Sequence, residues 1–255
     1  MSTAQQVISR TFAPAGLVGK VYARERGSSA APMSIGNVLE LELSHKEDVQ
    51  SQPDMTRLGG GQHAEIRRVT EVEVKMKLAD LNAVNLARAS LGTVTGVEAG
   101  TVTDEAHTVT LGGLLRTAHI APEDVEVRIA GAGGTDVPAA GNWEATAAGV
   151  VVFANATELA DGAEVVISYK HGSYAVIEAL TTKAKELELI FEGLNEADDG
   201  KPCIVEIWRA SQGVASSIGL MADKGFASLP VSGAILRDDS KQGAGISRFY
   251  RVRKA

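Results

Sequence analysis

The sequence predicts a mainly β protein with one flanking α-helix and a small antiparallel β unit inserted into the main domain. Three segments, 38–44, 71–78 and 186–192, alternate apolar and charged residues with a period of two. That period places one apolar and one charged face on a strand. The chain also has 27 glycines and only 4% aromatic residues, which is typical of a turn-rich, strand-rich protein with a core of Val, Leu and Ile.

Length and composition indicate a globular protein. A chain of 255 residues, 44% apolar and 22% charged, can form one large domain or two modest ones. The single cysteine, Cys203, excludes an intramolecular disulfide and is best interpreted as a buried structural residue. No apolar run approaches the roughly 20 residues that span a bilayer, and residues 1–10 lack the layout of a signal peptide. We therefore expect no membrane insertion and no secretion by the general route.

The first half of the main domain begins with an N-terminal arm over residues 1–16. Strands are expected at 19–26, 38–44 and 71–78. Between the last two, residues 45–62 contain Pro53 and three consecutive glycines and are predicted to form a long loop. Long loops in compact domains are usually functional or mobile. Two interpretations stay open: an ordinary connection, or a loop that becomes ordered against a partner.

A helix is predicted from Asp80 to Leu91. Asp80 is expected to cap its first turn, and Gly92 to take the left-handed conformation that ends it. The apolar stripe is expected to comprise Leu81, Val84, Ala87, Arg88 and Leu91.

The amino-acid composition changes over residues 93–172, which are rich in Gly, Ala, Thr and Val. Between Gly92 and Gly172 there are eleven acidic and three basic residues, so this segment carries −8 of the net charge of −7 and the remainder about +1. Strands are expected at 125–129, 149–153 and 164–169, which predicts an inserted, Ig-like small β domain. The main domain, begun at 17–92, resumes over 173–255 with strands at 186–192, 202–209, 226–236 and 246–252.

Patterns for chemistry are missing from the sequence. The five histidines are scattered, without metal-ligand spacing, and no glycine-rich segment has the context of a phosphate-binding loop. The carboxylates of Glu40, Glu42, Glu186 and Glu188 lie on predicted charged strand faces rather than in a pocket that would separate their pKa values. We therefore predict no catalytic residues, no metal and no cofactor. A dense basic patch for gripping phosphates is also missing.

Short stretches in a shared order carry a resemblance to a known family. They are Leu39-Glu40-Leu41, Arg57-Leu58-Gly59-Gly60-Gly61, Arg68, Asp80-Leu81-Asn82, Asn85-Leu86-Ala87-Arg88, Phe191-Glu192-Gly193-Leu194-Asn195, Ile235-Leu236-Arg237-Asp238 and Gly243-Ala244-Gly245-Ile246-Ser247-Arg248-Phe249. Together these regions resemble the tail tube proteins of bacteriophages with long, non-contractile tails. The resemblance covers roughly two thirds of the chain.

This resemblance implies a β-sandwich or partial-barrel subunit that forms hexameric rings, which stack into a tube for the passage of genomic DNA. Such a subunit is assembled in the host bacterial cytoplasm, belongs to the virion tail, and meets tape measure, tail tip and terminator proteins. The ring-stacking loop would contain Asp54, Arg57, Leu58, Gly59, Gly60 and Gly61. A lumen of mildly negative or mixed charge would be lined by Glu40, Glu42, Lys75, Lys77, Glu186 and Glu188.

Alternative functions are the inner tube of a contractile tail or secretion apparatus, which shares the ring-forming architecture, and a stand-alone β-sandwich binding module. Against the binding module, Trp143 and Trp208 are isolated and aromatic residues are few, whereas sugar-binding platforms need exposed aromatic faces.

Overall fold

The computed structural model describes all residues except 1–4, 7, 9–11, 132–133 and 222–224. Strands make up 52% of it, which confirms the mainly β prediction. The chain divides into two compact units: unit 1 comprises residues 1–94 and 177–255, and unit 2 comprises residues 95–176. We describe each unit by itself.

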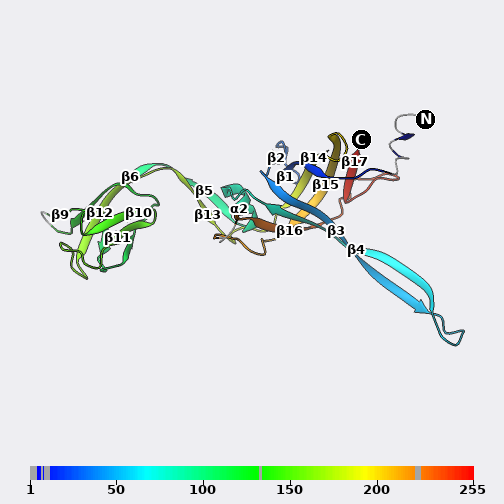
Figure 1. Ribbon diagram of the computed structural model, residues 1–255, viewed down its shortest axis with the longest axis horizontal. Helices are drawn as coiled ribbons and strands as arrows, with labels where there is room; N and C mark the ends of the chain where they lie inside the picture. The colour runs from blue at the N-terminus through cyan, green and yellow to red at the C-terminus, as the bar shows by residue number, and fades with distance from the viewer. Residues whose placement is uncertain (1–4, 7, 9–11, 132–133, 222–224) are drawn as a thin grey trace. The chain divides into compact units, whose positions relative to one another are not determined.

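Unit 1 contains one curled antiparallel sheet. Its strand order is β2-β1-β14-β15-β16-β4-β3, and β17 pairs with the first part of β15 (Figure 1). The bounds are β1 Leu17–Glu25, β2 Met33–Ser34, β3 Val38–Pro53, β4 Gln62–Leu78, β14 Glu186–Asn195, β15 Lys201–Gln212, β16 Leu229–Ile235 and β17 Tyr250–Lys254. Every predicted strand of the main domain is therefore present, but β3 continues nine residues beyond its predicted end and β4 begins nine residues before its predicted start.

The core of unit 1 lies on one face of this sheet. Val74 and Met76 of β4 pack with Leu187 and Leu189 of β14, while their charged neighbours in the sequence point the opposite way. Burying such aliphatic side chains contributes about 1.5–3 kcal/mol each. Leu39 was expected on this apolar face, but its side chain is 58% exposed, because the register shifts between Val38 and Glu40.

The predicted helix is shorter than expected. Helix α2 runs from Ala83 to Ala89, and its N-cap is Asn82, whose Oδ1 accepts from the Asn85 amide at 2.9 Å. Asp80 does not cap it, because its Oδ2 accepts from the Asn37 amide at 2.7 Å and so ties the end of β4 to the start of β3.

The predicted stripe of this helix was correct only in part, since Ala87 is buried and Leu81, Arg88 and Leu91 are half-buried. The buried residues of α2 are Asn85, Ala87 and Ala89, whereas Val84 is exposed. At the C-terminal end Leu91, not Gly92, has a positive φ, of 50°. Gly92 serves close packing instead, since a Cβ there would lie 2.5 Å from the Glu178 carbonyl oxygen.

Unit 2 is a small sandwich of two sheets with its own core. The sheet β6-β12-β8-β9 faces the sheet β10-β11-β7, and side chains from both, such as Ile167 and Val150, form one cluster. The strands are β6 Gly100–Thr108, β7 Leu114–Arg116, β8 Glu123–Ile129, β9 Asp136–Val137, β10 Trp143–Thr146, β11 Gly149–Val152 and β12 Glu164–His171. The chain enters and leaves this unit through β5 (Thr93–Val97) and β13 (Tyr174–Glu178), which pair with each other.

Candidate assembly surface

A long β-hairpin replaces the loop predicted over residues 45–62. Strand β3 continues to Pro53 and β4 begins at Gln62, so only residues 54–61 form the loop. The two strands stay paired from Val38–Leu78 out to Pro53–Gln62. Their outer halves continue past the body of the sheet in unit 1 (Figure 1). The structure therefore contains an extended arm where the sequence indicated an irregular loop.

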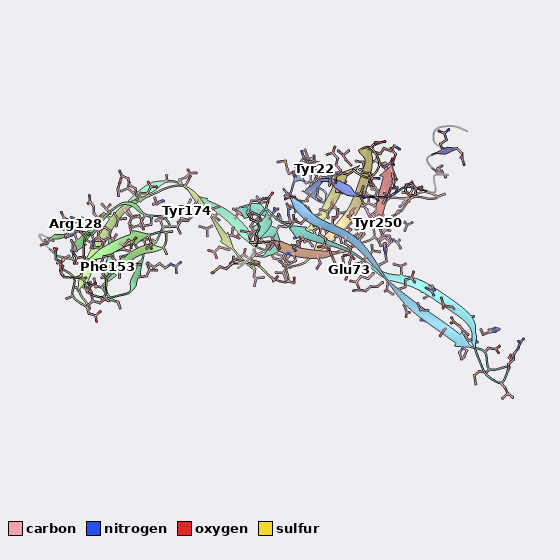
Figure 2. The ribbon with its side chains drawn as sticks, in the orientation of Figure 1. Tyr22, Glu73, Arg128, Phe153, Tyr174 and Tyr250 are labelled. Atoms are coloured by element: carbon pink, nitrogen blue, oxygen red, sulfur yellow. The ribbon has the colours of Figure 1, made fainter. Side chains whose placement is uncertain are left out.

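Cross-strand ionic contacts hold the hairpin where it leaves the sheet. Lys46 Nζ lies 2.7 Å from Glu71 Oε2 and 2.9 Å from Glu73 Oε1, and Figure 2 shows Glu73 at this point of β4. Farther out, Arg67 of β4 reaches Glu47 of β3 at 3.5 Å and also contacts Glu65. Exposed pairs of this kind contribute little individually, about 0–1 kcal/mol. The backbone ladder carries most of the pairing.

The tip of the hairpin has a defined conformation. Asp54 Oδ1 accepts from both the amide and the hydroxyl of Thr56, at 2.8 and 2.6 Å, which closes a turn and lowers the pKa of that carboxyl. Gly59, Gly60 and Gly61 all have positive φ, a conformation that residues with a Cβ adopt at a cost. The glycine run is therefore needed for the reversal itself. Arg57 and Leu58 lie between these features, and the Leu58 side chain is fully exposed.

The outer hairpin, residues 45–70, is almost fully exposed to solvent. From His45 to Thr70 every residue is exposed except the half-buried Asp54. The exposed set includes large apolar side chains on both strands and the tip, namely Val49, Met55, Leu58, Ile66 and Val69. An isolated two-stranded ribbon is at best marginally stable in water. A long exposed ribbon with apolar side chains is the kind of surface that another polypeptide covers.

Four of the predicted lumen residues form one mixed-charge patch. In the β3–β4 register Glu40 lies opposite Lys77, and Glu42 lies opposite Lys75. All four residues line one shallow groove beside Ser232 of β16. None of the four has an ion-pair partner among the described residues, and all are exposed. The patch therefore presents two carboxylates and two ammonium groups to solvent.

Glu186 and Glu188 lie apart from that patch, on β14. Glu186 accepts two hydrogen bonds from Arg209, at 2.6 and 2.7 Å, and this contact lowers the pKa of its carboxyl. Glu188 accepts from Arg24 at 2.7 Å. Both carboxylates are thus neutralised by arginines of neighbouring strands, which the sequence pattern did not reveal because the partners are more than twenty residues away.

An apolar groove at the ends of the sheet was missed by sequence reasoning. Strands β1 and β3 stand near opposite ends of the strand order, yet both line a groove of about 490 Å³. The curl of the sheet therefore brings its two ends together as a partial barrel. Leu17, Val18 and Leu39 on its rim are exposed. The only sequence signal was Leu39, whose apolar side chain was assigned to the core.

Residues considered for chemistry occupy structural positions. Cys203 is a buried free thiol on β15, as predicted. Trp143 and Trp208 are buried and donate from Nε1 to the carbonyl oxygens of Val137 and Ser247. Within the described residues no group of three or more His, Cys, Asp or Glu could hold a metal ion. None of their helices is long and apolar enough to cross a membrane.

The histidines are less scattered in space than in sequence. In unit 2 the rings of His119 and His171 stack with centroids 3.8 Å apart, and His119 Nδ1 lies 2.9 Å from the Tyr174 hydroxyl. The structure thus brings together two histidines that the sequence separates by about fifty positions. Their neighbours are aromatic rings and backbone groups, which is typical of packing.

The fold and its exposed arm define a mainly β, two-unit protein whose most distinctive surface is a projecting hairpin. The model of the family described as "Protein of unknown function UCP028589" matches residues 15–253, and the chain belongs to this family. No curated protein matches the sequence.

Proposed function

We propose that this protein is a non-enzymatic structural subunit that assembles with copies of itself into the tail tube of a bacteriophage. The observation that carries the proposal is the outer β3–β4 hairpin, which exposes apolar side chains along about twenty-five residues. Ordering that ribbon costs conformational entropy, and few buried contacts within this chain are available to offset that cost. A neighbouring copy in a stacked ring would supply the missing contacts.

The sequence and the shape of the hairpin tip support the proposal. The motif from Arg57 to Gly61, which contributes to the resemblance to tail tube proteins, forms its tip. Asp54 and the three glycines shape the turn, and Leu58 presents an apolar side chain at its end. A tip of fixed shape suits a repeated contact between identical subunits, because each copy presents the same surface.

The charges on the outer face of the sheet are compatible with a conduit for DNA. The patch formed by Glu40, Glu42, Lys75 and Lys77 is balanced, and Glu186 and Glu188 are paired with arginines. A balanced or mildly negative lumen would let DNA pass. A lumen lined by many unpaired Lys and Arg side chains would instead bind the DNA phosphates, release their counterions and hold the DNA. The assignment of these six residues to a lumen is part of the proposal.

Electron microscopy of two proteins across a concentration series tests the proposal. One protein is the wild type. In the other, the shortened variant, residues 47–70 are replaced by Asn-Gly, so that the paired residues Lys46 and Glu71 flank a two-residue turn. The wild type is expected to form rings or hollow tubes. The shortened variant is expected to remain dispersed while keeping the circular dichroism and thermal unfolding of a folded sheet.

Two outcomes would contradict this assignment. Tubes formed by the shortened variant would show that assembly does not need the hairpin. Dispersed wild-type particles at every concentration would contradict self-assembly of this chain.

A further inference from the structure

A small cationic pocket lies in unit 1, away from the hairpin. It has a volume of about 210 Å³ and lies between α2, the segment that leads into β14, and the end of β15. Three cationic side chains, those of Arg88, Lys183 and Lys185, and one carboxylate, that of Glu25, line it. This is a local excess of positive charge in a protein whose net charge is −7.

Arg88 is the unusual member of the pocket. It lies in the last turn of α2 and is half-buried, and burial lowers the pKa of its guanidinium. Among the described residues it has neither an ion-pair partner nor a hydrogen-bond partner for its side chain. Its charge gains from the carbonyl end of the helix. A guanidinium taken partly out of water is nevertheless costly unless an anion pairs with it.

Gln212 is a buried polar residue beside the same pocket. Its side chain lines the same pocket and is only 5% exposed, and its buried Nε2 donates to no group in the described structure. A buried amide donor without an acceptor costs about 1–3 kcal/mol. Because Nε2 is closed off from solvent, the donors that the pocket offers to a ligand are those of its cationic side chains.

The remaining cations complete the pocket. Lys185 Nζ is 2.9 Å from Glu25 Oε2, so these two charges compensate each other. Lys183 is exposed and unpaired among the described residues. The Thr182 amide donates to the Leu91 carbonyl at 2.8 Å, which fixes the segment carrying Lys183 against the end of α2. The unpaired charges that line the pocket are thus Arg88 and Lys183.

From this arrangement we infer that the pocket binds one oxyanion group, a phosphate or a carboxylate. Arg88 would hold it through its planar pair of N–H donors, and Lys183 would close the pocket from the solvent side. A planar guanidinium matches the oxygen spacing of either group. The volume accommodates one such group. The ligand is either a free ion or a carboxylate side chain of a second copy of this chain.

Isothermal titration calorimetry of the monomeric protein with sodium phosphate and with sodium acetate, at constant ionic strength in chloride, tests this inference. We expect binding of at least one of the two at one site per chain. Arg88→Gln is expected to weaken it at least about tenfold, the loss of one charge-assisted contact. Arg116→Gln, which removes an exposed arginine of unit 2, is the matched control and should bind as the wild type does.

Arg88→Lys keeps the charge but removes the planar fork, so its binding is expected to be intermediate. This variant replaces Arg88→Gln in the comparison if Arg88→Gln does not fold. Absence of heat with both anions, or equal affinity in wild type and Arg88→Gln, would overturn the inference. Because the titration uses monomers, its result is independent of the proposed assembly.

A second arm identifies the source of the oxyanion. If the ligand is a carboxylate of another copy, phosphate will inhibit self-association of the wild type, and Arg88→Gln will associate at least about tenfold more weakly. If it is a free ion, the two proteins will associate equally, while Arg88→Gln binds phosphate more weakly than the wild type.

Discussion

At the scale of single residues, ion pairs between distant strands carry part of the stability of unit 1. Glu186 is held by Arg209, and Arg26 reaches Asp238 at 3.0 Å beside it. Arg209 lowers the pKa of the Glu186 carboxyl from its ordinary value of 4.5. A group with a lowered folded-state pKa stabilises the protein above its unfolded pKa and loses that effect as the pH falls.

Stability is therefore expected to fall as the pH drops below about 4.5, because protonation of Glu186 removes the negative charge that pairs with Arg209. Glu186→Gln should be less stable than the wild type at pH 7 and similar to it at low pH. Urea unfolding at pH 7 and at pH 3.5 measures both differences. Glu40→Gln is the control, since Glu40 has no ion-pair partner among the described residues; an equal loss in both variants would contradict the role of the Glu186–Arg209 pair.

The two asparagines of the α2 region make separable contributions. Asn85 is buried, and its Nδ2 donates to the Ile35 and Asp80 carbonyls at 2.8 and 3.0 Å. Asn85→Ala would leave the buried Ile35 carbonyl and the partly buried Asp80 carbonyl without this donor and is expected to lower the free energy of unfolding by about 2–3 kcal/mol. Asn82→Ala removes only the cap and should cost about 1 kcal/mol. Thermal unfolding compares them, and an equal loss would contradict the buried role of Asn85.

These residues show where sequence reasoning stops at this scale. Asp80 and Asn82 are both acceptable helix caps, and the choice between them depends on the Asn37 amide, which donates to Asp80 from the residue just before β3. Likewise, Glu186 reads as a solvated carboxylate until the fold brings Arg209 beside it. Local propensity predicted that the helix exists, and tertiary contacts decided its ends.

At the scale of elements, the strands with regular alternation were predicted and the outer hairpin was not. Residues 71–78 alternate Val, Val, Met and Leu with charged residues because one face covers the core. Residues 45–53 and 62–70 have no such face, since neither side of the outer hairpin covers a core, and the alternation disappears. A strand without a buried face has no period-two signal, so its polar sequence resembles a loop.

The tip of the hairpin is expected to affect association without affecting folding. Met55 and Leu58 are among the most exposed side chains of unit 1. Replacing both by serine removes apolar surface that is not packed against this chain, so the unfolding temperature should stay within about 1 °C of the wild type. Association measured by analytical ultracentrifugation should weaken at least about tenfold if the tip is buried in a contact. The control Lys75→Ser keeps the tip; unchanged association in the Met55/Leu58 variant would contradict a role for the tip.

At the scale of the whole molecule, two separate hydrophobic cores follow from the change in composition. The core of unit 1 and that of unit 2 share no residue, and unit 2 begins and ends within a pair of adjacent strands, β5 and β13. The sequence placed the insertion at 93–172 from its acidity and its Gly, Ala, Thr and Val content, and the compact unit is 95–176. The inserted unit can be recognised from a change in amino-acid composition because its residues pack into a core of their own.

Deletion of unit 2 provides the last test, since adjacent β5 and β13 strands can be joined without distorting unit 1. A protein in which residues 97–174 are replaced by Asn-Gly is expected to keep the calorimetric transition of unit 1 and lose that of unit 2. Residues 95–176 expressed alone should show the missing transition at the same temperature. If the proposed tube forms through unit 1, the shortened protein should still assemble in the electron microscope. Loss of tubes with an intact unit 1 transition would instead show that unit 2 contributes contacts between subunits.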